Sequence, residues 1–214
     1  MTDTMDQAYR ACESITRSQA RNFFYGIRLL PTSKRNALCA LYALSRRIDD
    51  IGDGDEPNEV KAEQLATLRA ELHAIESSTD PVLMAVHDTA RHFPVPMGAF
   101  DELIDGVEMD VTGREYATFD DLVGYCRCVA GAVGRLCLGV FGSRPDPHAS
   151  DYADALGIAL QQTNILRDIR EDLSNGRIYL PAADLDRFGV TLKLDEHGTL
   201  ADPDGRLADL ITEA

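Results

Sequence analysis

Hydrophobic periodicity is the feature that most constrains the fold of this chain. Apolar residues recur every three or four positions along nearly its whole length, as on one face of a helix. In the segment Lys34–Asp53, for example, Leu44 and Ile48 lie one turn apart on the apolar face. No segment alternates between apolar and polar residues as a half-buried strand would. The chain is therefore predicted to be all-α.

Turn residues divide this pattern into consecutive helices, without a linker or repeat that would separate domains. The predicted helices are Met5–Thr16, Ser18–Leu30, Lys34–Asp53, Glu59–Glu76, Val82–His92, Met97–Val111, Leu122–Phe141 and Asp151–Leu173. Thr118, with Asp121 three residues later, resembles a capping box. We expect residues 1–214 to form one domain. The last nine residues read as the opening turns of a helix, so we expect a C-terminally shortened bundle.

Composition excludes some classes of function. A formal net charge of −15 argues against nucleic acid as a partner, although a bridging divalent cation would still permit a phosphorylated substrate. Five cysteines, without a CxxC pair, indicate the reduced thiols of a cytoplasmic protein. The N-terminus lacks a signal-peptide pattern, and no run reaches about 18 consecutive apolar residues. The oligomeric state is left open.

A first acidic stripe ends the apolar segment Lys34–Asp53. Asp49 and Asp53 lie four residues apart, on one helix face, and Tyr42 and Arg46 fall near the same face. Negative charge is unfavourable at the C-terminus of a helix, so this cluster needs a reason. It is either a solvated helix end or a binding site for a cation.

A second stripe runs through the segment "QQTNILRDIRED". Gln161, Asn164, Asp168 and Asp172 follow a three-four-four spacing and share one narrow face of an otherwise apolar helix. A stripe this narrow is not the usual solvated half of a surface helix.

Carboxylates arranged in this way favour a hard cation. Two of them about 6 Å apart repel by about 1–3 kcal/mol at a surface-like dielectric. Neither stripe offers His or Cys, so zinc is not expected, whereas oxygen ligands suit Mg²⁺. An acidic Ca²⁺ binder is the other reading, but no loop has EF-hand spacing.

Several segments together resemble the squalene/phytoene synthase family of head-to-head prenyl transferases. In chain order they are "FFYGIRLLP", "ALYALSRRIDDIGD", "LIDGVEMDV", "YCRCVAGAVG" and "QQTNILRDIREDLSNGRIYLP". The last segment is the most specific. The sequences of the third and fourth segments most resemble the bacterial presqualene diphosphate synthase branch of hopanoid synthesis, and the phytoene synthase branch is nearly as similar.

The resemblance implies an all-α isoprenoid-synthase bundle around a central cavity. It implies that Mg²⁺ is held by Asp49, Asp53, Asn164, Asp168 and Asp172, and that the four aspartates act in catalysis with Tyr42 and Arg46. It also implies a set of substrate-binding residues. These are Arg21, Asn22, Tyr125, Val129, Ala130, Val133, Gln161, Asn164, Arg167, Arg177 and Tyr179.

The implied reaction is a head-to-head condensation of two prenyl diphosphates, most simply two farnesyl diphosphates to presqualene diphosphate or squalene. NADPH would be needed only for squalene. The base is left open between the released diphosphate and a tyrosine hydroxyl. The alternatives are a phytoene synthase that uses geranylgeranyl diphosphate, and a catalytically silent scaffold, which the four retained aspartates disfavour.

Some positions depart from the family pattern or admit two readings. A Ser/His-containing phosphate-binding stretch of the family corresponds here to "SQARNFF", where Arg21 and Asn22 are the substitutes. The segment "VAGAVG" fits either a tail tunnel or close helix packing. For Asp110 two roles are equally open, lining the pocket or making a structural contact. Greasy substrates are compatible with peripheral membrane contact, but no basic amphipathic anchor is present.

Overall fold

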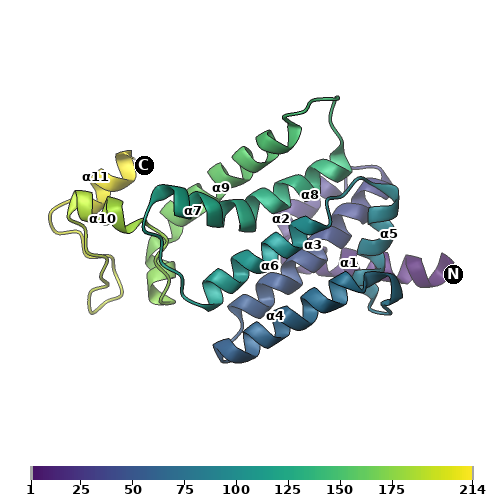
Figure 1. Ribbon diagram of the computed structural model, residues 1–214, viewed down its shortest axis with the longest axis horizontal. Coiled ribbons are helices and arrows are strands. Elements are labelled where there is room, and N and C mark those ends of the chain that lie inside the picture. The colour runs from purple at the N-terminus through teal and green to yellow at the C-terminus, as the bar shows by residue number, and fades with distance from the viewer. Residues whose placement is uncertain (1, 214) are drawn as a thin grey trace.

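The computed structural model describes residues 2–213, and helices account for most of them (Figure 1). The α-helices are α1 (Thr2–Gln19), α2 (Arg21–Ile27), α3 (Thr32–Asp53), α4 (Asn58–His73), α5 (Pro81–His92), α6 (Gly98–Val111), α7 (Phe119–Cys126), α8 (Ala132–Phe141), α9 (Ala149–Ser174), α10 (Ala182–Phe188) and α11 (Arg206–Glu213). Between residues 2 and 213 the only β pairing is an isolated bridge between Leu194 and Leu200. The all-α prediction is confirmed.

Helix α3 is the centre of the larger core. It packs against α1, α4, α5, α6 and α8, and its buried face includes Leu44 and Ile48. Ala and Cys at several of its core positions let neighbouring helices approach closely. The apolar face predicted from the periodicity is therefore the face that this helix buries.

A smaller core lies between α7, α9 and the C-terminal helices. It is built on Tyr125 of α7, Ile165 and Ile169 of α9, and Leu207 and Leu210 of α11. The two chain termini lie at opposite ends of the molecule, with α10 and α11 next to the C-terminus (Figure 1). Val129, between α7 and α8, packs against both cores and so joins them.

The predicted helix Leu122–Phe141 has a more detailed structure than its periodicity suggested. It begins at Phe119, where Thr118 and Asp121 form the expected capping box. Its middle is a π-helical segment, Arg127–Gly131, that separates α7 from α8. Length and composition alone would let Phe119–Phe141 cross a membrane, which is weak evidence, because the same helix packs against α6 and α9.

Two other boundaries differ from the expectation. The predicted helix Ser18–Leu30 is shorter, because α1 continues to Gln19 and α2 spans only Arg21–Ile27. Helix α4 ends at His73, and a short 3₁₀ turn, Ile75–Ser77, follows it. All five cysteines are free thiols, as expected.

Candidate active site between α3, α6 and α9

The acidic end of α3 is held against two neighbouring helices. A Cβ added at Gly52 would lie 2.4 Å from Cγ1 of Val107 on α6, so glycine permits the close approach. Lys61 of α4 donates from Nζ to the Gly52 carbonyl at 2.9 Å. This positive group also offsets the negative end of the helix dipole. The contacts fix the place of Asp49 and Asp53.

Asp49 is half-buried at this end of α3. Burial raises the pKa of its carboxyl to about 7, and the charge of Asp53 adds to the rise, while Arg46 opposes it. A carboxyl in this state resists ionisation unless a cation lies beside it.

Arg46 was expected to share a face with Asp49 and Asp53, but it pairs with Asp50 instead. Its Nη2 lies 2.6 Å from Oδ1 of Asp50, and it lines a hollow of about 400 Å³ between α1, α3 and α4. Its Nε is buried without a hydrogen-bond partner in the described part of the chain. An unused buried donor suits an anionic oxygen.

Among the described residues, the acidic stripe of α9 has one carboxylate in an ion pair, Asp168, and one outside any ion pair, Asp172. Asp168 is held by its neighbour Arg167, with Nε to Oδ1 at 2.8 Å, and this bond lowers the pKa of Asp168. Burial and the charge of Asp168 raise the pKa of Asp172 to about 6, against the opposing charge of Arg177.

Arg177 connects the stripes of α3 and α9. Its Nη2 lies 3.1 Å from Oδ1 of Asp53, and its charge acts on Asp110 of α6 and on Asp172 of α9. Four acidic or basic side chains from α3, α6, α9 and the following loop therefore converge. Arg177 therefore interacts with one carboxylate from each stripe, Asp53 of α3 and Asp172 of α9.

Asp110 belongs to this site, which sequence reasoning left undecided. It accepts hydrogen bonds from the hydroxyls of Tyr179 at 2.7 Å and Tyr125 at 3.0 Å. Burial raises the pKa of Asp110 despite these bonds. The available signal was the segment "LIDGVEMDV", but its spacing alone did not separate a pocket role from a structural one.

Three tyrosines form the wall behind Asp110. The ring centroids of Tyr125 and Tyr179 are 5.1 Å apart, and Tyr116 lies 5.4 Å from Tyr125. Burial raises the pKa of each of these hydroxyls, so all three stay protonated at neutral pH. The wall supplies hydrogen-bond donors and an apolar face.

Other predicted site residues lie farther from the charged centre or pack between helices. Tyr42, Gln161 and Asn164 are half-buried on α3 and α9. Arg21 and Asn22 are exposed on α2, and between residues 2 and 213 no ion pair or hydrogen bond connects them to the carboxylates.

The predicted tail-tunnel residues make close helix contacts. A Cβ added at Gly106 of α6 would lie 2.5 Å from Cγ1 of Val129. A Cβ added at Gly157 of α9 would lie 2.6 Å from the carbonyl oxygen of Ala130. Val133 packs against the larger core. These contacts correspond to the packing interpretation of "VAGAVG".

The donor set suits a hard divalent cation in its chemistry. The converging ligands are carboxylate oxygens, with pKa values raised at Asp49 and Asp172 because the negative charges are crowded and partly buried. Within the described residues, no group of three or more His, Cys, Asp or Glu side chains is already gathered at metal-binding distances. By ligand type and by charge, the carboxylates nevertheless fit Mg²⁺.

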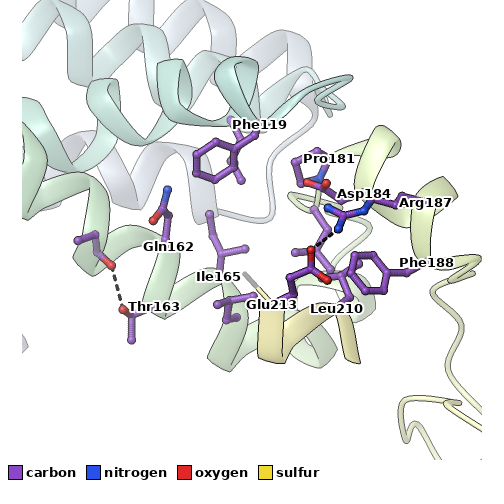
Figure 2. Close-up of a pocket in the computed structure, with 14 residues that line it drawn as sticks. Phe119, Gln162, Thr163, Ile165, Pro181, Asp184, Arg187, Phe188, Leu210 and Glu213 are labelled. Atoms are coloured by element: carbon purple, nitrogen blue, oxygen red, sulfur yellow. Dashed lines mark hydrogen bonds and ion pairs between the residues drawn. The ribbon is translucent and has the colours of Figure 1, made fainter. Parts of the chain in front are cut away.

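A separate hollow of about 420 Å³ lies on another face of α9, against α7, α10 and α11. Figure 2 shows Phe119 and Ile165 across it from Phe188 and Leu210, with an ion pair between Arg187 and Glu213 at its edge. It uses other residues of α9 than the acidic stripe does. It is therefore not part of the charged site.

The fold and the site define an all-α isoprenoid synthase, an enzyme of the prenyl transferase type. The chain belongs to the squalene/phytoene synthase family, whose model matches residues 16–214. Members of this family act on prenyl diphosphates. The resemblance inferred from the motifs is confirmed.

Individual relatives narrow the comparison. A phytoene synthase of Mycobacterium tuberculosis is 58% identical over 207 residues, which are 97% of this chain and 68% of the relative. A 4,4'-diapophytoene synthase of Staphylococcus haemolyticus is 36% identical, over 88% of this chain and 67% of the relative. The chain thus spans about two thirds of the length of these relatives.

A solved structure agrees with the fold. A dehydrosqualene synthase in complex with a ligand superposes with a TM-score of 0.83 at 30% identity, covering 98% of this chain and 72% of that one. The names of the relatives favour the phytoene synthase alternative over the presqualene branch that the sequence analysis put first. Nothing in these comparisons supports NADPH.

Proposed function

We propose that this chain condenses two geranylgeranyl diphosphates head to head, as a phytoene synthase. The observation that carries the proposal is the convergence of Asp53, Asp110 and Asp172 on Arg177. The name of the relatives at 58% identity supports the substrate assignment.

The charged centre binds the diphosphate end of the substrate. Asp49, Asp53, Asn164, Asp168 and Asp172 would hold Mg²⁺, which when bound neutralises the diphosphate oxygens and makes diphosphate a better leaving group. Positive charge from the chain adds to this, since each arginine donates through a planar fork that matches phosphate geometry. Arg46, Arg167 and Arg177 are the arginines proposed for this role.

The first bond to break is the one between C1 and the diphosphate oxygen of one substrate. Both electrons leave with the diphosphate, and the arginines stabilise the charge that develops there. The allyl cation that remains must be shielded from water, which the apolar faces of α3 and α9 can do. The C2–C3 alkene of the second substrate then attacks the cation, and loss of one proton closes a cyclopropane.

We assign the proton to the released diphosphate rather than to a tyrosine. The hydroxyls of Tyr125 and Tyr179 donate to Asp110, and burial raises their pKa values, so neither becomes a phenolate at neutral pH. Their role in the proposal is to hold Asp110 and to form the wall of the site.

The second half of the proposed reaction needs no reductant. The cyclopropane intermediate still carries one diphosphate. This diphosphate leaves with its electron pair, and the carbon skeleton rearranges. Loss of a second proton then gives a neutral forty-carbon hydrocarbon. A squalene-type product would instead require a hydride donor.

Product analysis tests the proposal. Purified protein with Mg²⁺ is incubated with farnesyl or geranylgeranyl diphosphate, with and without NADPH, and the hydrocarbons are separated by chain length. We expect a forty-carbon product that does not depend on NADPH, and no product from Asp168→Ala with helix content unchanged. A thirty-carbon product alone would support the farnesyl assignment, and an active Asp168→Ala would show that the metal is misplaced.

A further inference from the structure

Two of the arginines proposed to bind diphosphate are paired with carboxylates that are proposed to bind the metal. Arg177 lies 3.1 Å, through Nη2, from Oδ1 of Asp53, the last residue of α3. Arg167 donates from Nε to Oδ1 of Asp168 on α9 at 2.8 Å. In each acidic stripe, the cation and an arginine therefore compete for the same carboxylate.

Arg177 is the counter-ion at the centre of the charged site. Burial raises the pKa of Asp110 on α6 and of Asp172 on α9, and the positive charge of Arg177 opposes both rises. With its ion pair to Asp53, this guanidinium acts on carboxylates from three helices. The chain itself thus supplies positive charge to the place where the acidic side chains are crowded.

The backbone of Arg177 is fixed by the end of α9. Its amide donates to the carbonyl of Asp172 at 2.8 Å, and the amide of Gly176 donates to the carbonyl of Leu173 at 3.1 Å. These two bonds form a Schellman motif, and Gly176 has the positive φ of 75° that the motif requires. Any exchange of partners by Arg177 therefore needs only a rotation of its side chain.

The contact between Arg177 and Asp53 is of a kind that a cation can displace. It is one hydrogen bond, from Nη2 to Oδ1, and not the two parallel bonds of a full arginine fork. The Asp53 side chain is 58% exposed, and an ion pair this open to solvent contributes little stability. Once Asp53 binds a cation, the planar guanidinium is available to phosphate oxygens.

We propose that Arg177 exchanges partners, neutralising Asp53 until a divalent cation binds there and then pairing with the diphosphate of the substrate. This inference rests on the proposed function, in which Asp53 is a ligand of Mg²⁺. It makes two affinities depend in opposite ways on one side chain. Arg177 competes with the cation for Asp53, but it adds to the binding of diphosphate.

Isothermal titration calorimetry of Arg177→Gln tests the exchange without turnover. The titrants are Mg²⁺ alone, and inorganic diphosphate in saturating Mg²⁺. Arg187→Gln is the matched control, because it makes the same change of side chain and charge at a residue that pairs with Glu213 beside the separate hollow. Circular dichroism compares the helix content of both variants.

We expect Arg177→Gln to lower the Kd for Mg²⁺ about threefold to tenfold, because a positive charge that competes for Asp53 is removed. The Kd for inorganic diphosphate should rise about tenfold, through loss of a charge-assisted hydrogen bond. Arg187→Gln should change neither Kd. Arg177→Lys keeps the charge without the fork, so its Kd for Mg²⁺ should stay near that of the unsubstituted chain while diphosphate binds more weakly.

Shifts of opposite sign in the two Kd values distinguish exchange from a structural role, which would weaken both ligands. The inference is overturned if Arg177→Gln leaves the Kd for Mg²⁺ unchanged or raises it, or if the unsubstituted chain binds no Mg²⁺. The proposed function fails on a different result, namely that the unsubstituted chain forms no hydrocarbon from either prenyl diphosphate. Opposite shifts in Arg177→Gln would still support the exchange in that case.

Discussion

At the scale of single residues, the site is defined by carboxyl groups whose ionised form is destabilised. Asp49 and Asp172 have raised pKa values because they are partly buried beside other negative charges. The pKa of Asp110 is raised as well, although the hydroxyls of two tyrosines donate hydrogen bonds to it. Two carboxyls of this group, Asp49 and Asp172, lie on the stripes that the spacing of the aspartates revealed from sequence. Asp110 could not be chosen, because its role depends on tyrosines 15 and 69 residues away in the chain.

Asp49→Asn should stabilise the metal-free protein at pH 8. The folded pKa of Asp49 is about 7 and the ordinary value is 3.8, so between about pH 4 and pH 7 the folded chain retains a proton that the unfolded chain has lost. Stability contributed by this proton is present at low pH and is lost as pH rises to about 7. The difference corresponds to a free energy of unfolding on the order of 2–4 kcal/mol.

Urea unfolding with EDTA at pH 5 and pH 8 measures this effect. Asp186→Asn, an exposed residue of α10, is the control. The same dependence on pH in both variants would contradict the assignment to Asp49.

Asp110→Asn should lower turnover by about 10–100-fold, the usual effect of losing a partner that orients a site. The amide keeps the size of the side chain but offers one acceptor oxygen to two tyrosine hydroxyls. Steady-state kinetics with circular dichroism for helix content measures the outcome. Tyr116→Phe is the matched control in the same tyrosine wall. The hydroxyl of Tyr116 is buried without a hydrogen-bond partner among the described residues, so its removal should leave activity intact.

At the scale of helices, periodicity predicted the long elements well, because each buries a continuous apolar stripe. Helices α3, α6 and α9 lie close to their predicted ranges. The π segment was missed, and the break between the first two helices was predicted near Arg17 instead of Ala20, since neither feature depends on which residues are apolar. The π segment follows from contacts with α6 and α9 that are distant in sequence. The preference of Arg46 for Asp50 was missed for a related reason, because both Asp49 and Asp50 lie within its reach on the helix.

Gly157→Ala should destabilise the protein by about 1–3 kcal/mol, as overpacking of a core does. The new Cβ would lie 2.6 Å from a backbone carbonyl of the π segment, which cannot rotate away. Gly124→Ala, on α7, meets nothing within 4 Å and should stabilise by about 0.5–1 kcal/mol through helix propensity. Denaturant unfolding of both variants gives the comparison. An undisturbed Gly157→Ala protein would mean that α9 and the π segment can separate at little cost.

At the scale of the whole molecule, the charge of −15 and the crowded site act together. The sequence predicted one acidic edge on α3 and another on α9 from the spacing of their aspartates. It could not reveal that Arg177 stands between them, since that arginine comes from the loop after α9 and pairs with Asp53 across 124 residues. A cation that binds there relieves repulsion both in the site and across an acidic surface.

Mg²⁺ should therefore raise the Tm of this protein, and more strongly at pH 8 than at pH 6. Protons compete with the metal for Asp49, whose pKa of about 7 lies between these two conditions, so binding is weaker on the acidic side. At a hundred times the Kd, stabilisation is about 2.7 kcal/mol. Differential scanning calorimetry with and without Mg²⁺ at both pH values measures the effect, and removal of the metal with EDTA should reverse it. Because the proposed ligands lie on both α3 and α9, Asp53→Ala and Asp168→Ala should each weaken the response, whereas Asp186→Asn should leave it unchanged. An equal rise in Tm in all three variants would place the cation elsewhere on the acidic surface.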